Sequence, residues 1–264
     1  MADLLIELVS EEIPARMQSG AGRNLARLLE TALSGLGVWS DASTITGLCA
    51  SRHLIAYATN IMVSQPDKII EKRGPRTDAP EAAIAGFLKS ADIERSALIE
   101  KDTPKGRFFF ARSELKGSKT EDFLVLTITK LLDQFPWPKS QRWGGGKFRW
   151  VRPLHRINLV FDGRPITGAL DLGSGEQIEF GATSCGHYFE APDDIDLSDA
   201  ISLDDVKTRL RDAFVIVDPA ERQNAILDGA QALAGAKSCK VNEVQLENYL
   251  EEIVGLVEWP TPLM

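Results

Sequence analysis

The stretch DLLIELV, residues 3–9, is a short apolar run whose length and composition indicate a buried β-strand. From Pro14 the apolar residues change to helical spacing, and glycines at 35 and 37 end this helix. Working outward, the pattern predicts strands at 43–48, 54–63 and 107–115 and helices at 81–91 and 121–132. The order strand, helix, strand, strand, helix, strand is that of a ferredoxin-like, split β-α-β domain.

The segment FPWPKSQRWGGGK, residues 135–147, holds two prolines and three consecutive glycines and interrupts all periodicity. We therefore expect a domain boundary there, with one α+β domain at 1–137 and a second at 138–264. The second domain is predicted to contain strands at 156–161, 165–170, 177–182 and 215–217, and helices at 203–214, 219–234 and 243–257. The expected fold class is α+β, with two domains of mixed helix and sheet layers.

The composition indicates a globular protein that works in the cytoplasm. The chain has 264 residues, of which 44% are hydrophobic, and a formal net charge of -8. Its acidic N-terminus is unlike a signal peptide, and no apolar run approaches the roughly 18 residues that span a bilayer. Cys49, Cys185 and Cys239 lack CxxC spacing and fit reduced thiols. We expect a cytoplasmic location and no membrane role.

The stretch RWGGGKFRWVRPLHR, residues 142–156, concentrates cations and aromatic rings and has no acidic residue. One interpretation is phosphate contact by the cations, with Trp143, Phe148 or Trp150 stacking on unpaired bases. The other is that carboxylates elsewhere in the fold neutralise the cations while the rings belong to the core. Alternation along FRWVRPL predicts that Arg149 faces solvent and that Arg152 is drawn into the structure. The candidates for phosphate contact are Arg149 and Arg156, followed by Lys147 and Arg142.

A second basic cluster is EKRGPRTD, residues 71–78. Gly74 would allow the backbone to approach an anion closely, and Lys72, Arg73 and Arg76 would favour a phosphate there. The alternative is a solvated turn, stiffened by Pro75, whose charges face water. Both interpretations remain open from the residues alone.

The residues offer no visible catalytic constellation. The segment GGGK at 144–147 lacks the spacing of a phosphate-binding loop, and no nucleotide-binding or nucleophile motif occurs. His187 lies two residues from Cys185, but no further pair of ligands has convincing spacing for a metal. We therefore expect neither catalytic residues nor a metal site. An autonomous enzyme would have to show an activity of the isolated chain on a small substrate.

Seven stretches, taken in order, resemble the N-terminal region of the bacterial glycyl-tRNA synthetase beta subunit. They are LLIELVSEEIPA (4–15), EKRGPR (71–76), AIAGFLKS (83–90), RWG (142–144), FRWVRPLHR (148–156), GHYF (186–189) and LVEWP (256–260). Two stretches depart from that family's pattern. A TPRRLA-like motif is replaced by ASRHLIA, so His53 replaces an arginine, and GHRF is replaced by GHYF, so Tyr188 removes a cation. These changes argue against phosphate contacts at those two positions.

The resemblance implies a ligase of two alpha and two beta subunits that joins glycine to tRNA(Gly) at the expense of ATP. In that family the alpha subunit binds glycine and ATP with Mg, and the beta subunit supplies tRNA recognition, so no cofactor is expected on this chain. Family members continue beyond the EWP motif through a histidine-aspartate type domain and an anticodon-binding domain. We therefore expect these residues to represent the N-terminal two-fifths, without anticodon recognition. The alternative function is a scaffold that holds the alpha subunit without touching RNA.

Overall fold

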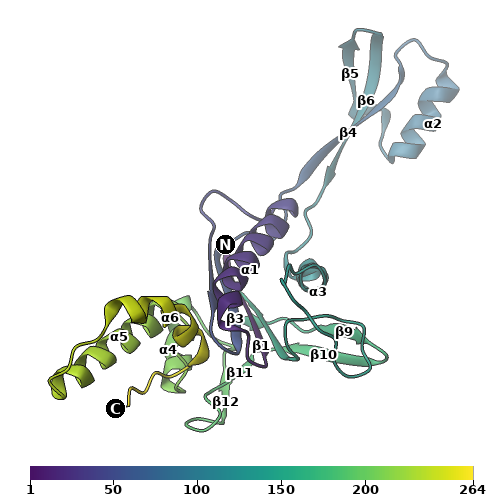
Figure 1. The fold of residues 1–264 in the computed structure, drawn as a ribbon. Coiled ribbons are helices and arrows are strands. Elements are labelled where there is room, and N and C mark those ends of the chain that lie inside the picture. The colour runs from purple at the N-terminus through teal and green to yellow at the C-terminus, as the bar shows by residue number, and fades with distance from the viewer. Residues whose placement is uncertain (264) are drawn as a thin grey trace. The chain divides into compact units, whose positions relative to one another are not determined.

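The computed structural model describes residues 1–263, with the backbone only for residues 243–245, 247 and 248. The chain forms two compact units (Figure 1). Unit 1 comprises Met1–Val63 together with the chain from Thr120 onward, and unit 2 comprises Ser64–Lys119. The predicted boundary between residues 137 and 138 is wrong, because one sheet of unit 1 pairs strands from both sides of it.

The sheet of unit 1 has the strand order β2-β3-β1-β7-β10-β9, with β8 also pairing with β7. Its neighbours are antiparallel except for β7 and β10, which run parallel. The strand β1 lies between β3 and β7, which explains why the run DLLIELV is almost entirely buried. The bounds are β1 Ala2–Ser10, β2 Thr44–Cys49, β3 His53–Ile61, β7 Leu154–Phe161, β8 Arg164–Pro165, β9 Ala169–Gly173 and β10 Glu176–Gly181.

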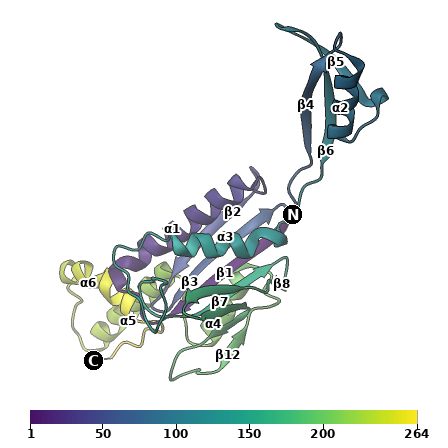
Figure 2. The same ribbon diagram turned by 90° about the vertical axis from the view of Figure 1, so that its right-hand side faces the viewer.

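Helices α1 (Ala15–Gly35) and α3 (Glu121–Asp133) cover one face of this sheet (Figure 2). The helical spacing of Leu25, Leu29 and Leu33 places all three against the same core as Leu4 and Ile6 of β1. Burying each such side chain contributes about 1.5–3 kcal/mol. The opposite face packs against α4 (Leu203–Asp212). The sheet is therefore covered on both faces.

The helix α1 approaches β2 unusually closely at a pair of glycines. A Cβ atom built on Gly47 would lie 2.0 Å from the carbonyl oxygen of Gly22, which is far inside van der Waals contact. No side chain can occupy that space unless the helix moves away from the strand. The two glycines therefore set the distance between α1 and the sheet.

The C-terminal half of unit 1 is mainly helical and follows the predicted pattern closely. Ser202 caps α4, since its hydroxyl accepts from the backbone N–H of Asp205, and Asp218 caps α5 (Pro219–Ala236) in the same way. The helix α6 spans Glu243–Leu256, and β11 (Thr183–Cys185) pairs with β12 (Asp194–Asp196). The predicted strand at 215–217 is wrong, because these residues are buried without joining a ladder.

Unit 2 is a three-stranded antiparallel sheet with one α-helix. The strand order is β4-β6-β5, with β4 at Lys68–Arg76, β5 at Leu98–Thr103, β6 at Gly106–Leu115 and α2 at Glu81–Ala91. A short 3-10 turn, Arg95–Ala97, precedes β5. The assignment of residues 107–115 as the fourth strand of the first sheet is wrong, because they form the centre of this separate sheet. In unit 1 the place beside β1 belongs to β7.

Candidate functional site

The most exposed cations of the predicted basic stretch lie on the loop between α3 and β7. Lys139, Arg142, Lys147 and Arg149 are all exposed, and none of the four forms an ion pair with a carboxylate of residues 1–263. Arg149 instead donates from Nη2 to the carbonyl oxygen of Ser140 at 2.7 Å. The prediction that Arg149 faces solvent is confirmed. We call residues 139–149 the basic loop.

The three glycines of the basic loop allow it to lie directly against the hairpin of β9 and β10. A Cβ atom on Gly146 would lie 2.5 Å from the carbonyl oxygen of Leu172, and one on Gly144 would lie 2.9 Å from a carboxylate oxygen of Glu176. The N–H of Lys147 donates to the same Leu172 oxygen at 2.6 Å. The glycines are therefore needed for close packing within unit 1, where the sequence suggested a domain junction.

The aromatic residues of the stretch form a buried cluster beneath the basic loop. Trp150 is fully buried, and its ring centroid lies 5.0 Å from Phe135, 5.0 Å from Trp137 and 6.0 Å from Phe148. Trp143 meets Phe148 edge to face at 5.9 Å. Phe148 and Trp150 have no free ring face for a base, so the core interpretation holds for these two rings.

Arg156 and Arg152 are tied into the protein to different degrees. Arg156 pairs with Asp194 at 2.8 Å and donates to the carbonyl oxygens of Thr183 and Ser184, so it holds β11 and β12 against β7. Arg152 is half-buried and donates to the carbonyl oxygen of Val151. Of the four candidates in this stretch, the structure leaves Arg142, Lys147 and Arg149 as cations without a carboxylate partner among residues 1–263.

The second predicted cluster lies on β4 and is not a loop. Lys72 is 3.5 Å from the hydroxyl of Ser90 on α2, and Arg76 forms a two-bond ion pair with Asp78. Arg73 is exposed, with its guanidinium carbon 3.8 Å from the ring centroid of Phe108. The three cations therefore do not converge on one anion site.

The role proposed for Gly74 also changes. A Cβ atom on Gly74 would lie 2.5 Å from the ring of Phe87, which projects from α2 onto β4. The glycine makes room for this ring to pack on the strand. The close packing of Phe87 explains why a glycine is needed at position 74. Gly74 therefore gives no support to an anion-binding site at this point of the chain.

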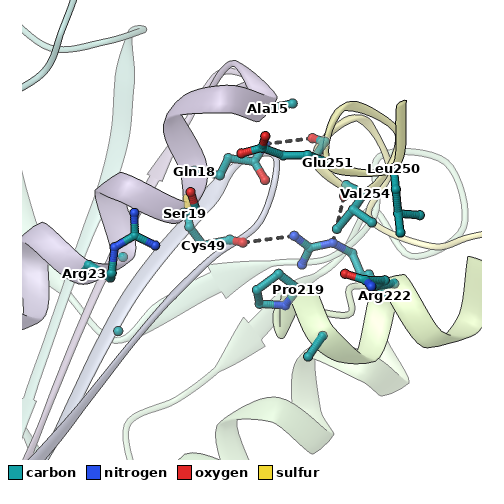
Figure 3. Close-up of a pocket in the computed structure, with 15 residues that line it drawn as sticks. Ala15, Gln18, Ser19, Arg23, Cys49, Pro219, Arg222, Leu250, Glu251 and Val254 are labelled. Atoms are coloured by element: carbon teal, nitrogen blue, oxygen red, sulfur yellow. Dashed lines mark hydrogen bonds between the residues drawn. The ribbon is translucent and has the colours of Figure 1, made fainter. Parts of the chain in front are cut away.

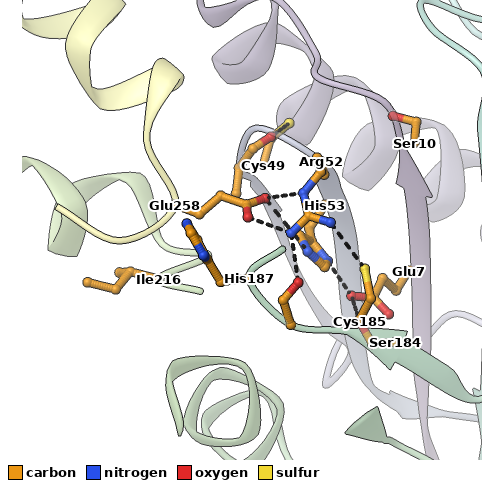
Figure 4. A network of polar contacts seen from close by, with 12 residues as sticks. Glu7, Ser10, Cys49, Arg52, His53, Ser184, Cys185, His187, Ile216 and Glu258 are labelled. Atoms are coloured by element: carbon orange, nitrogen blue, oxygen red, sulfur yellow. Dashed lines mark hydrogen bonds and ion pairs between the residues drawn. The ribbon is translucent and has the colours of Figure 1, made fainter. Parts of the chain in front are cut away.

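A buried polar network, which sequence reasoning missed, joins the sheet to the segment after α6 (Figure 4). At its centre the Glu7 carboxylate accepts from His53 at 2.9 Å, from Asn158 at 2.7 Å and from Ser184 at 2.8 Å. Nε2 of His53 lies 3.9 Å from the carboxylate of Glu258. Since these partners come from distant parts of the chain, no local motif signals them.

The charges of this network are set by burial and by mutual contact. Burial opposes the charged form of His53, but its contacts with Cys185, Glu7 and Glu258 outweigh that effect and raise the pKa of His53 to about 10. Burial would likewise raise the pKa of Glu7, yet the hydrogen bonds from His53, Asn158 and Ser184 hold it below its ordinary value. At neutral pH the pair is therefore an imidazolium and a carboxylate.

Arg52 extends the network to the C-terminal segment and to the GHYF stretch. It binds Glu258 through two hydrogen bonds, at 2.9 and 2.6 Å, and donates to the carbonyl oxygen of Gly186 at 2.8 Å. The Tyr188 ring centroid lies 3.9 Å from its guanidinium carbon. His53 and Tyr188, the two departures from the family pattern, therefore flank the same arginine. The network holds these segments of unit 1 together, and Nε2 of His53 is its one buried polar atom without a hydrogen-bond partner among the described residues.

A cavity of about 560 Å³ lies between α1 and the pair α5 and α6 (Figure 3). Arg222 lies at its edge, is fully buried, and donates to the carbonyl oxygens of Cys49, Ile216 and Val254 at 3.0, 2.5 and 3.0 Å. Burial lowers the pKa of this guanidinium. Because Arg222 presents no accessible surface and binds three backbone segments, it acts as a structural clamp.

Within residues 1–263, no group of three or more histidine, cysteine, aspartate or glutamate side chains gathers to hold a metal ion. No helix of the described part of the chain is long and apolar enough to cross a membrane. The geometry thus offers an exposed basic loop and a buried structural network. An α+β chain with these features fits a subunit or module that binds a partner.

Comparisons with known proteins identify the class of protein to which the chain belongs. The sequence model of a family described as "Glycyl-tRNA synthetase beta subunit" matches residues 4–264. This places the chain among the subunits of aminoacyl-tRNA synthetases, which are ligases. The chain belongs to the glycyl-tRNA synthetase beta subunit family.

The similar proteins include three glycine--tRNA ligase beta subunits. The chain is 41% identical to that of Paracoccus denitrificans and 38% identical to those of Rhodospirillum centenum and Ruegeria sp.. Each alignment covers the whole of this chain. It covers 37% of the length of the Paracoccus protein, 39% of the Rhodospirillum protein and 37% of the Ruegeria protein. The chain therefore spans about two-fifths of the length of these curated relatives.

Proposed function

We propose that these residues form part of a glycine–tRNA ligase beta subunit and contribute both to binding tRNA(Gly) and to assembly with the catalytic alpha subunit. The observation that carries the proposal is the basic loop, where four exposed cations lack a carboxylate partner in the described chain. A protein with formal net charge -8 would otherwise repel RNA over long distances, so its contacts must be local.

The buried aromatic cluster supports this role by anchoring the basic loop. Trp150 and Phe148 hold one end of the loop in the core, and the glycines hold its middle against β9 and β10. A loop that is fixed before binding loses less conformational entropy when it meets a ligand. Phosphate contacts from such a surface position an RNA without reading its sequence.

The family membership also supports a proposal for the rest of the assembly. We propose an arrangement of two alpha and two beta subunits in the cytoplasm, in which glycine and ATP with Mg bind to the alpha subunit. The names of the relatives, which call them beta subunits, support an alpha partner. In this arrangement the residues described above supply no atom to the chemical step.

The test is a charge reversal on the basic loop, with Arg142, Lys147 and Arg149 each replaced by glutamate. The chain is assembled with its alpha subunit, and tRNA(Gly) binding is measured at several salt concentrations. We expect weaker binding and a logarithmic salt dependence that flattens by about 0.7–0.9 for each phosphate that the variant no longer binds. The matched control replaces three exposed cations elsewhere, Arg27, Lys237 and Lys240, by glutamate.

An equal loss of affinity in both triple variants would show a general charge effect and would contradict the proposal. The scaffold function is favoured by one observation, the exposure of large apolar side chains in the C-terminal part of unit 1, with Phe189 89% and Ile201 80% exposed. Unchanged tRNA affinity together with failure to associate with the alpha subunit would support the scaffold.

A further inference from the structure

The two faces of the unit 2 sheet are covered differently. Along the central strand β6, Phe109 and Ala111 alternate with Phe108 and Phe110, so the two pairs point to opposite faces. Lys72, which is opposite Ala111 in the ladder, contacts Ser90 on α2. The helix α2 therefore covers the face of Phe109 and Ala111, and unit 2 has no second α-helix in the described residues.

The face opposite α2 carries aromatic rings overlaid by cations. The guanidinium carbon of Arg73 lies 3.8 Å from the ring centroid of Phe108. Lys101 lies 5.5 Å from the ring centroid of Phe110 and is paired with Glu71 of the same face. Arg112 projects from the same face, two residues beyond Phe110 on β6. Arg73 and Arg112 are exposed, and neither forms an ion pair with a carboxylate of the described chain. This is the aromatic face of unit 2.

Unit 2 is also the cationic part of an acidic chain. Residues 64–119 hold twelve lysines and arginines against nine aspartates and glutamates, whereas the rest of the chain holds eighteen against twenty-nine. The net charge is therefore +3 for unit 2 and -11 for the remainder. A polyanion would be attracted to unit 2 and repelled by the net charge of unit 1.

We propose that the aromatic face of unit 2 binds unpaired nucleotides of an RNA by base stacking. The guanidinium carbon of Arg73 lies 3.8 Å from the ring centroid of Phe108 and Arg73 is exposed, so a nucleobase can reach the guanidinium and stack on it. Arg112 lies within the same face to contact the adjoining phosphates. Open sheet faces that combine aromatic rings and cations bind single strands in this manner.

The RNA that binds the aromatic face must be single-stranded, because stacking on Arg73 requires an unpaired base. The bases of a duplex are already stacked on one another and hide their faces, whereas a flat sheet needs a base that is free to turn onto it. The inference rests on the proposed function only for the identity of the RNA as tRNA(Gly). The surface itself is distinct from the basic loop of unit 1 and is tested separately.

The experiment compares three single substitutions in the full chain. Arg73→Ala removes both the charge and the plane, Arg73→Lys keeps the charge and removes the plane, and Lys89→Ala removes a charge on the covered side, from α2. The probe is a fluorescein-labelled single-stranded RNA of about twelve nucleotides, and a hairpin duplex of the same composition is the second probe. Binding is measured by fluorescence anisotropy.

We expect Arg73→Ala to weaken binding of the single strand about tenfold, and the duplex by much less, since the variant cannot stack on one of the bases. Arg73→Lys should restore less than half of the affinity that Arg73→Ala loses, measured on a logarithmic scale. The reason is that an ammonium group carries the charge but offers no planar surface for stacking. Lys89→Ala should bind as the original protein does. A single strand that carries 5-bromouridine should crosslink to the peptide containing Phe108 and Phe110.

Several outcomes would overturn the inference. If Arg73→Ala binds the single strand normally while the basic loop variant binds tRNA(Gly) weakly, the aromatic face is not an RNA site and the proposed function stands. If neither variant affects RNA, both proposals fail. If Arg73→Ala instead weakens association with the alpha subunit and leaves RNA binding intact, the face is a protein docking surface.

Discussion

At the scale of single residues, His53 is the group whose chemistry the fold alters most. It is fully buried between the carboxylates of Glu7 and Glu258, and its pKa is raised to about 10. The unfolded chain titrates this group near its ordinary value of about 6.5. The stabilisation from the charged imidazole is therefore fully present below about pH 6.5 and is lost as pH rises through about 10.

This predicts a specific loss of stability at alkaline pH. The free energy of unfolding, measured by urea denaturation, should fall between about pH 7 and pH 10 more steeply for the original protein than for His53→Gln, which cannot titrate. The difference between the two curves isolates His53 from the lysines and tyrosines that titrate in the same range. Parallel curves over this interval would show that His53 is not held in its charged form.

The sequence identified the basic residues but not how each one is used. Arg149 was correctly placed on the surface because its neighbours Phe148 and Trp150 are strongly apolar. The partner of Arg156, Asp194, lies far along the chain on β12, and no spacing rule connects the two. The network around Glu7 was invisible for the same reason, since a buried carboxylate is recognised only by partners that the fold assembles.

At the scale of elements, the Gly22 and Gly47 contact defines how α1 packs on the sheet. Gly47→Ala should force the helix away from β2 and lower the free energy of unfolding by about 1–3 kcal/mol or more. Gly20→Ala in the same helix is the matched control, since nothing lies within 4 Å of its added Cβ. This control should stabilise the protein by about 0.5–1 kcal/mol. Similar urea midpoints for both variants would contradict the close-packing argument.

Helices and turns that a proline or glycine marks in the sequence are predicted well. Strands without an alternating apolar pattern are missed. The helices at 81–91 and 219–236 begin at or after a proline, and the turn at Asp162 and Gly163 has the positive φ angles that its sequence suggests. The strand β4 was missed because charges and a Gly-Pro pair obscure its alternation, and all of Lys68–Arg73 is exposed. The strand β5, LIEKDT, is similarly polar at one end.

At the scale of the whole molecule, unit 2 is one continuous segment of the chain, and its two end residues pair with each other. The N–H of Thr120 donates to the carbonyl oxygen of Val63 at 2.9 Å, and Ser64 forms a bridge with Lys119. We predict that replacing residues 64–119 by a short linker of glycine and serine leaves unit 1 folded. Its thermal unfolding, followed by circular dichroism, should remain cooperative with a midpoint within a few degrees. Loss of cooperativity would show that unit 1 depends on unit 2.

The largest difference between the predicted and the observed fold is the position of the boundary between the two units. Prolines and glycines at 135–147 mark an irregular segment, but a loop packed on a hairpin and a linker between domains share that composition. The true transitions, at 63–64 and 119–120, lie beside the isolated bridge between Ser64 and Lys119, and only the single residues Pro66 and Gly117 mark them in the sequence. The long-range pairing of β1 with β7 decides the division, and no local pattern in the sequence reveals that pairing.

The position of β7 after the inserted unit also orders events during synthesis on the ribosome. The strands β1, β2 and β3 are complete by residue 61, yet the partner for the other edge of β1 begins only at residue 154. At about 5–20 residues per second, the nascent chain carries that apolar edge unpaired for roughly 5–20 seconds. Unit 2 is local in sequence and can fold within this interval. During this interval the edge of β1 is an unpaired strand edge, of the kind that chaperones protect from aggregation.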